Sequence, residues 1–293
     1  MPSTHTNRRL DTREIRSILV PTDFSDTANH AFIYAANLAW TLQARLVAMH
    51  AFYTSPVAEG VAPADFMEKI RQEKITEAQA KFDLYKADIQ RLFGSELLVE
   101  YKIEPGDAID HILTLSQNSP IDLIVMGTLG QESIAENILG SVTSRVIGRA
   151  SCPVLAIPKG VRYQPIRHIL FATNLEETDS VVVDQLLSYA DLFGASISCV
   201  HVHTPDDSGS SVDLSILENL YSAEINAKKV SFEVVNDHDI VRGLHHYVVT
   251  HQVDLVTLLT HRNVHNPEAF QKGLTRAFSL ETDVPLLAFH EDK

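Results

Sequence analysis

The sequence predicts an α/β protein made of two similar open-sheet units in tandem. The chain has 293 residues, about twice the length of an ordinary domain. Short apolar runs alternate with amphipathic helical stretches, which is the pattern of β-α-β units with a parallel sheet. A set of sequence segments also occurs twice, in the same order.

The repeat begins at the first strand-like run. Ile-Leu-Val-Pro-Thr-Asp at 18–23 returns as Ile-Leu-Phe-Ala-Thr-Asn at 169–174, which is 151 residues later (23 to 174). Two later segments return only 132 residues later (153 to 285), so the second copy lacks 19 residues from its middle (151 less 132). These segments are 121–125, repeated at 253–257, and 152–156, repeated at 284–288.

The boundary between the copies is expected in the polar stretch 159–165, which holds Gly160 and Pro165. The predicted domains are therefore 1–158 and 166–293. Residues 1–14 are polar, carry three arginines and have no apolar core of a signal peptide, so we expect a frayed arm there.

Each element of the first copy has its own signal. Strands are predicted at about 16–21, 45–50, 97–103, 121–126 and 153–157, from their apolar runs. A helix is predicted after the first strand, with Ser25 or Asp26 as its cap and apolar residues at steps of three and four from Ala28 to Leu42. A long, partly charged helix is predicted over 64–92, and the residues missing from the second copy fall there. The second copy has a loop signal at 205–211 instead.

Composition narrows the function classes. Hydrophobic residues make up 45% and charged residues 21% of the chain, as in globular proteins. The net charge of −14 argues against nucleic acid or an anionic membrane as the partner. No apolar run is long enough to cross a membrane. Only two cysteines are present, Cys152 and Cys199, which predicts no disulfide framework and a reducing, cytoplasmic compartment.

The strongest functional signal follows the fourth strand. Gly127 and Gly130 are followed, after nine residues, by Gly140 and Ser141 at the start of a predicted helix. Glycines let a backbone approach a ligand, and helix N-termini at the carboxyl edge of a parallel sheet bind anions. The amides near Val142 and the hydroxyls of Ser141 and Thr143 are therefore candidate phosphate contacts. Asp23, at the end of the first strand, is a candidate for a ribose hydroxyl or Mg²⁺.

These residues resemble the universal stress protein family, whose ATP-binding members carry the same Gly-x-x-Gly-x9-Gly-Ser/Thr pattern. Pro21 to Ser25 and the Cys-Pro-Val-Leu run at 152–155 extend the resemblance. The resemblance implies, in each half, a five-stranded parallel sheet of order 3-2-1-4-5 with helices on both faces, and pairing of the halves through their last strands. It also implies ATP, with Mg²⁺, in the first half. Adenine would lie near Pro21, Thr22 and the backbone at Ala51, and Met126 and Gly127 would flank the ribose.

Simpler interpretations stand beside these. The glycines can serve turn geometry alone. Asp23 can cap the following helix instead of touching a ligand, and Ser141 is expected to cap its helix with or without phosphate.

The second copy departs from the pattern. Leu259, Arg262, Lys272 and Gly273 stand where the first copy has Gly127, Gly130, Gly140 and Ser141, and Asn174 replaces Asp23. We expect this half to have lost ATP binding and to serve mainly for pairing, with another anion at Arg262 and Lys272 as the alternative. Eight of the 14 histidines lie between His201 and His265, but no complete set of ligands for zinc is recognisable.

The leading hypothesis is a nucleotide-dependent regulator in which ATP orders the loop 131–139 and changes a surface that an unidentified protein partner recognises. The alternatives are slow Mg²⁺-dependent ATP hydrolysis and a nucleotide-independent scaffold. No catalytic residue is assigned, because the chain has no P-loop lysine motif and no general base beside the expected γ-phosphate. The two halves should form an internal pseudo-dimer, and a further homodimer is left open.

Overall fold

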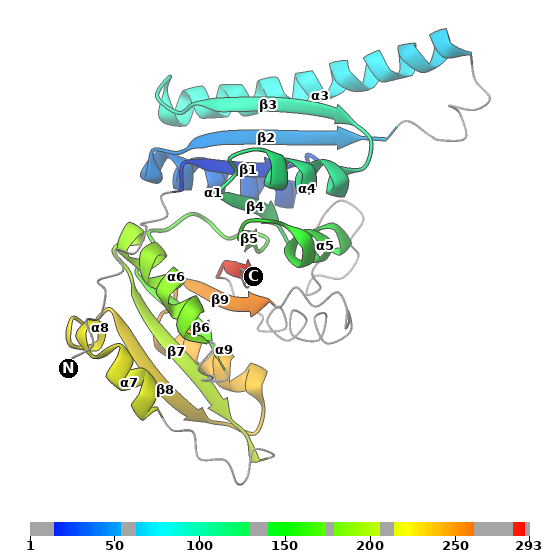
Figure 1. Ribbon diagram of the computed structural model, residues 1–293. Helices are drawn as coiled ribbons and strands as arrows, with labels where there is room; N and C mark the ends of the chain where they lie inside the picture. The colour runs from blue at the N-terminus through cyan, green and yellow to red at the C-terminus, as the bar shows by residue number, and fades with distance from the viewer. Residues whose placement is uncertain are drawn as a thin grey trace, which may run out of the picture.

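The computed structural model describes residues 15–53, 63–128, 140–173, 179–205, 214–260 and 284–290. Its ten strands form one twisted sheet in the order β3-β2-β1-β4-β5-β10-β9-β6-β7-β8 (Figure 1). The strands are β1 Ser17–Pro21, β2 Arg45–Phe52, β3 Val99–Pro105, β4 Leu123–Gly127, β5 Val154–Ile157, β6 His168–Ala172, β7 Ser196–His203, β8 Val230–Asn236, β9 Leu255–Thr260 and β10 Leu286–His290.

The sheet joins two halves with the same topology. All strand pairs within each half are parallel, and the order in each half is 3-2-1-4-5. The halves meet where β5 pairs antiparallel with β10, with Leu155 opposite Leu287. The expected fold class, including pairing through the last strands, is confirmed.

Helices cover both faces of the sheet. Buried residues of α1, α3, α6 and α7 belong to one cluster that runs through both halves, while α4 and α5 pack on the opposite face of the first half and α9 on that of the second. The helices are α1 Asp26–Leu42, α3 Ala64–Phe93, α4 Ala108–Asn118, α5 Ser141–Arg149, α6 Asp179–Phe193, α7 Ser215–Leu220, α8 Ser222–Asn226 and α9 Ile240–Thr250.

Helix α1 follows β1 as the sequence predicts. The Ser25 hydroxyl accepts a hydrogen bond from the Ala28 amide, so Ser25 is its N-cap. Its apolar residues face the sheet, and Phe32, Ala35 and Ala39 are fully buried. The helix ends at Gln43, whose left-handed backbone (φ 54°) lets its amide bond to the Ala39 and Trp40 carbonyls.

The shorter middle of the second half is explained by one helix. Helix α3 has 30 residues, and the short helices α7 and α8 occupy the corresponding part of the second half. The predicted long helix is therefore confirmed. Most of the loop predicted at 205–211 lies outside the described residues.

A matched aspartate precedes the fourth strand of each half. Oδ2 of Asp122 accepts hydrogen bonds from the amides of Arg16 and Ser17, both at 2.9 Å. Oδ2 of Asp254 accepts from Arg167 at 2.8 Å and from His168 at 3.0 Å. Each carboxylate thus joins the residues before the fourth strand of its half to the start of the first, and the repeat extends to individual hydrogen bonds.

The segment between β5 and β6 contains the predicted linker. It forms no helix or strand, and it is fixed to the first half because the Tyr163 hydroxyl donates to Thr41 Oγ1 at 2.9 Å and the Tyr163 ring packs edge-on against Tyr34. Cys152 and Cys199 are buried and form no disulfide. Among the described helices, none combines the length and apolarity of a membrane span.

Candidate functional site

The candidate site lies at the carboxyl ends of β1 and β4. These strands are neighbours in the sheet, with Ile18 opposite Leu123. From β1 the chain runs outward to β2 and β3, and later returns to β4 on the other side. This reversal of strand order is the place where open parallel sheets bind ligands. Pro21, Thr22 and Asp23 therefore share one edge with Gly127 and Thr128.

Thr22 joins the end of β1 to neighbouring elements through hydrogen bonds. Its amide donates to the Met49 carbonyl at 2.8 Å, and its hydroxyl oxygen accepts from the Phe24 amide at 2.9 Å and contacts the Tyr85 hydroxyl at 2.9 Å. The side chain is only 7% exposed. The hydroxyl is thus bonded within the turn after β1, and an adenine contact at Thr22 stays a prediction.

Phe24 holds an unusual conformation in this turn. Its φ is 61°, in the left-handed region that residues other than glycine rarely adopt. Its ring packs on His50, with centroids 4.5 Å apart, and on Phe82 at 5.1 Å. The ammonium of Lys81 lies 5.2 Å from the Phe24 ring centre. Packing from β2 and α3 therefore stabilises the turn.

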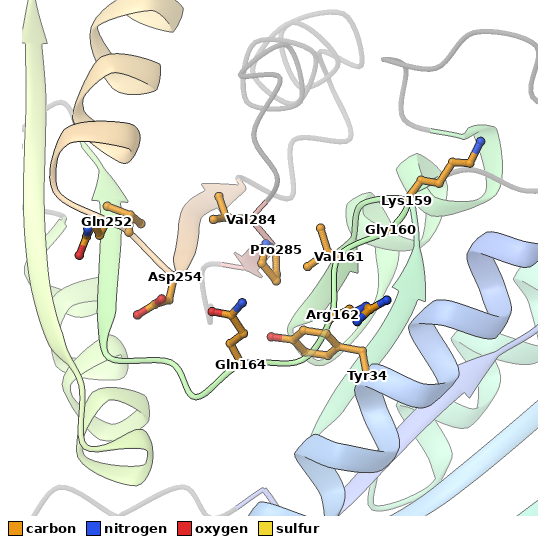
Figure 2. Close-up of a pocket in the computed structure, with 11 residues that line it drawn as sticks. Tyr34, Lys159, Gly160, Val161, Arg162, Gln164, Gln252, Asp254, Val284 and Pro285 are labelled. Carbon is orange, nitrogen blue, oxygen red and sulfur yellow. The ribbon is translucent and has the colours of Figure 1, made fainter. Parts of the chain in front are cut away.

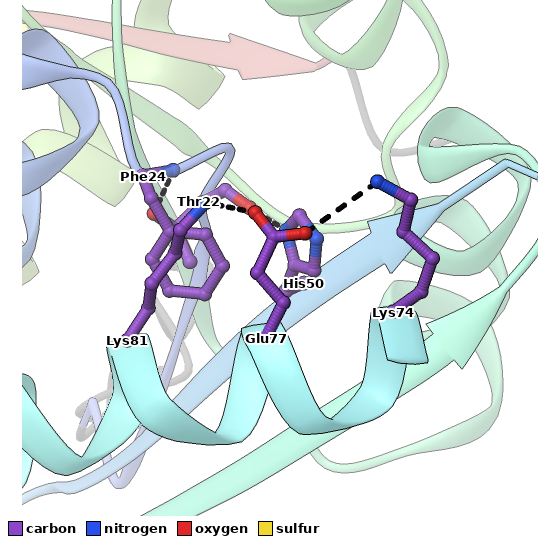
Figure 3. A network of polar contacts seen from close by, with 6 residues as sticks. All are labelled: Thr22, Phe24, His50, Lys74, Glu77 and Lys81. Carbon is purple, nitrogen blue, oxygen red and sulfur yellow. Dashed lines mark hydrogen bonds and ion pairs between the residues drawn. The ribbon is translucent and has the colours of Figure 1, made fainter. Parts of the chain in front are cut away.

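His50 links this turn to β2 and α3. Its Nδ1 lies 2.8 Å from the Thr22 carbonyl oxygen, and Figure 3 shows the ring behind Glu77, which is joined to Lys74 and Lys81. Burial lowers the pKa of His50, chiefly by penalising the charged imidazolium. The second half repeats the contact, with His201 Nδ1 3.1 Å from the Thr173 oxygen. Sequence reasoning gave His50 no role, although its repetition at His201 was a usable signal.

Asp23 is placed on the edge beside this turn. Its Oδ1 accepts a hydrogen bond from the Ser25 amide at 2.9 Å, and the carboxylate is partly exposed. Since Ser25 is the N-cap of α1, the interpretation of Asp23 as the cap is wrong. A contact of Asp23 with a ribose or with Mg²⁺ stays a prediction.

Gly127 has a structural reason to be glycine. A β-carbon at this position would lie 2.7 Å from Thr27 Cγ2 and 3.1 Å from the Thr27 carbonyl oxygen. These distances are shorter than ordinary packing allows, so β4 can approach α1 only because residue 127 has no side chain. Sequence reasoning assigned this glycine to ligand approach, and the structure assigns it to packing against a helix.

The start of α5 is tied to the end of β4. The Gly140 amide donates to the Thr128 carbonyl at 2.7 Å, and the Thr143 hydroxyl donates to the Gly127 carbonyl at 2.9 Å. Thr143 is only 4% exposed. Its hydroxyl, expected to bind phosphate, is instead committed to the framework, because its proton already bonds to a backbone oxygen.

The N-terminus of α5 has no side-chain cap. Gly140 is the N-cap residue, with extended backbone angles (φ −59°, ψ 149°) and no side-chain hydrogen bond to the helix. The expectation that Ser141 is the cap is therefore wrong: Ser141 is the first helical residue, and it and Val142 are exposed. The first-turn amides of a helix have no partner within the helix and carry partial positive charge, which suits an anion.

Of the remaining predicted site residues, some are described by the structure and others lie outside the described residues. Met126 lies in β4, with its side chain buried on the face of the sheet that α4 and α5 cover, and Ala51 is partly buried near the end of β2. Gly130 and the loop 131–139 lie outside the described residues, as do Asn174, Arg262, Lys272 and Gly273 of the second half. Leu259 lies in β9. The loss of ATP binding in this half stays a prediction.

The histidines of the second half form no visible metal centre in the described ranges. His201 and His203 share a strand, with ring centroids 6.5 Å apart, and His251 stacks on Tyr247 at 3.8 Å. Within the part of the chain that the structure describes, no three His, Cys, Asp or Glu side chains group as metal ligands. His261 and His265 lie outside it.

Comparison with known proteins decides the family. The model of the universal stress protein family matches residues 14–158. A universal stress protein of Methanocaldococcus jannaschii, MJ0531, is 31% identical over 148 residues, which cover 82% of that protein and 49% of this chain. The chain belongs to the universal stress protein family. A universal stress protein of Thermus aquaticus is 32% identical over 148 residues, covering 98% of that protein and 48% of this chain.

The full length of the chain also has a structural counterpart. The crystal structure of a universal stress protein from Archaeoglobus fulgidus matches 96% of this chain and 98% of its own, with a TM-score of 0.68 and 16% identity. At that identity the likeness shows the fold alone. It extends the universal stress protein architecture over both halves, whereas the family model matches the first half.

Proposed function

We propose that the first half binds ATP at the carboxyl ends of β1 and β4 and that the chain acts as a nucleotide-dependent regulator in a stress response. The observation that carries the proposal is the uncapped N-terminus of α5, fixed by the 2.7 Å hydrogen bond between the Gly140 amide and the Thr128 carbonyl. Free amides at a fixed helix N-terminus, beside a strand-order reversal, form an anion site.

The proposed contacts use groups at this edge of the sheet. The amides of Ser141 and Val142, with the exposed Ser141 hydroxyl, would hold phosphate oxygens. Asp23 would accept hydrogen bonds from the ribose, and the backbone of Pro21 and Ala51 would border the adenine. One family member was solved in complex with cAMP. That fact belongs to that protein, and the present proposal rests on this chain's own residues.

Asp23 is the residue at this edge that would hold a Mg²⁺ ion. One oxygen of this partly exposed carboxylate accepts the Ser25 amide, and a carboxylate is the kind of ligand that a hard cation bound to phosphate prefers. Such an ion would neutralise part of the negative charge of the triphosphate.

The two halves are proposed to differ in role. Domains of 1–158 and 166–293 would share the sheet, with ATP in the first and pairing as the main task of the second. The joint is β5 with β10. Strand β5 also pairs with β4, whose end carries Gly127. The proposed nucleotide site is therefore next to the strand through which the halves pair. The protein partner that would respond is unidentified.

Calorimetric titration of the full chain with ATP tests this function. Wild-type protein is expected to bind one equivalent, and Gly130→Arg, which introduces the residue of position 262, is expected to abolish binding because it adds bulk beside the phosphates. Val181→Arg, at an exposed position of α6 in the other half, is the matched control and should bind like wild type. Binding retained in Gly130→Arg, or absent in the wild type, would refute the proposal.

A further inference from the structure

A cavity lies at the junction of the halves, away from the proposed nucleotide site. It has a volume of about 590 Å³ and is bordered by the linker after β5, by α1 and by the residues that precede β9 and β10 (Figure 2). Its walls include Tyr34, Val161, Gln164, Asp254, Val284 and Pro285. A pocket of this size accommodates a small molecule.

Tyr34 is the unexplained residue of this cavity. Its side chain is 2% exposed, and its ring packs on Tyr163. Its hydroxyl has no hydrogen-bond partner among the described residues, although buried tyrosine hydroxyls normally have one. Figure 2 shows the hydroxyl directed toward the side of the cavity where Gln164 and Asp254 lie. The phenol is neutral at physiological pH, and burial raises its pKa further above the ordinary value of about 10.

Asp254 brings a charge to the same side. Its Oδ2 accepts the Arg167 and His168 amides, which fixes the carboxylate in place. Its other oxygen has no partner in the described ranges. Gln164 and Tyr34 line the same side of the cavity and each has an oxygen that can accept a hydrogen bond; we call these two residues and Asp254 the acceptor end of the cavity.

The rest of the cavity has a different chemistry. Val161, Val284 and Pro285 supply apolar surface. The two cations on its border are turned elsewhere: in Figure 2 the ammonium of Lys159 and the guanidinium of Arg162 point away from the acceptor end. The matched aspartate of the first half, Asp122, holds its amides in the same way but is not part of this cavity.

We propose that this cavity binds a small primary amine. Its ammonium donates to Asp254, Tyr34 and Gln164, and its alkyl part packs on Val161, Val284 and Pro285. An ammonium carries three donors, which matches three acceptors, and it compensates the carboxylate charge. A hydroxyl has only one donor, and a quaternary ammonium has none. Because the ligand touches the linker, α1 and the residues before β9 and β10, its binding would stabilise the junction of the halves.

Ligand-observed NMR titration of the full chain tests the proposal with three probes of similar size. We expect n-butylamine to bind at millimolar concentration, n-butanol to bind several-fold more weakly, and tetramethylammonium not to bind. Saturating ATP should leave the butylamine affinity unchanged, because the nucleotide site is elsewhere, so failure of either proposal is recognisable by itself. Equal binding of butanol and butylamine, or no binding of butylamine, would overturn this one.

Two variants and two matched controls test whether butylamine binds at the acceptor end of this cavity. Tyr34→Phe removes only the hydroxyl and should weaken butylamine binding about 3- to 10-fold, and Asp254→Asn should weaken it about 10-fold or more while keeping an acceptor for the two amides. Tyr163→Phe, whose hydroxyl bonds to Thr41 outside the cavity, and Asp122→Asn should leave it unchanged. Equal loss in Asp122→Asn and Asp254→Asn would refute the assignment.

Discussion

Gly127 touches Thr27 so closely that a β-carbon on residue 127 would lie 2.7 Å from Thr27 Cγ2. The contact joins the end of β4 to the first turn of α1, at the edge of the sheet where the nucleotide site is proposed. One of the motif glycines therefore contributes to the fold itself, so the effect of its replacement on stability has to be measured separately from any effect on ligand binding.

Replacing this glycine should destabilise the protein through packing. Gly127→Ala is expected to cost about 1–3 kcal/mol of unfolding free energy, because α1 or β4 must shift to admit the methyl group. Urea denaturation measures the loss. Thr27→Ser removes the Cγ2 atom and should recover part of it in the double variant. An unchanged midpoint in Gly127→Ala would show that the contact is not constraining.

The matched aspartates should stabilise the two halves similarly. Asp122→Ala and Asp254→Ala each leave two backbone amides at the start of a strand without their acceptor, and each should cost about 1–3 kcal/mol. The Asn variants keep one acceptor oxygen and should cost less. Denaturant titration of the four variants checks this, and a negligible loss in both alanine variants would contradict it.

His50 should make stability depend on pH on the acid side. Its folded-state pKa is lowered by burial, so below about pH 6.5 the unfolded chain binds a proton that the folded chain does not. Stability should therefore fall as pH decreases from that value toward the folded pKa, with a slope from this residue of at most about 1.4 kcal/mol per pH unit.

Comparison of variants isolates this slope. His50→Gln should flatten the dependence of the urea midpoint on pH, while His246→Gln, at an exposed position of α9, should leave it as in the wild type. The same slope in His50→Gln as in the wild type would mean that other groups cause it.

The proposed regulator mechanism makes a prediction for the loop 131–139. If ATP orders this loop, its amide hydrogen exchange should slow when ATP is added, and the amides that follow it at the start of α5 should slow with it. Mass-resolved exchange with and without ATP measures both. Slower exchange only outside 128–145, or none at all, would remove the switch even if ATP binds.

Much of the fold was predictable because it follows from local sequence patterns and from the internal repeat. The apolar runs of the strands, the steps of α1 from Ala28 to Leu42 and the shifted offset of the repeat each reflect short-range or copied information. The family resemblance supplied the strand order, which the sheet confirms. The 30-residue α3 and the short helices that replace it lie where the offset changes.

The site was less predictable because its residues contact partners that are far away in the sequence. That Gly127 accommodates Thr27, and that Thr143 bonds to Gly127, depends on how α1 and α5 pack against β4. The wrong cap at Ser141 has a similar cause: the Gly140 amide bonds to Thr128, which keeps residue 140 extended and makes it the N-cap. The Tyr34 cavity is lined by residues of both halves, so it depends on how the halves pack together. No sequence motif predicted it.

The most direct test of the central claim is native mass spectrometry of the intact chain in the presence of ATP. One nucleotide per chain, lost in Gly130→Arg and retained in Val181→Arg, is the result that a single site in the first half predicts. Two nucleotides per chain, or one that survives Gly130→Arg, would contradict it.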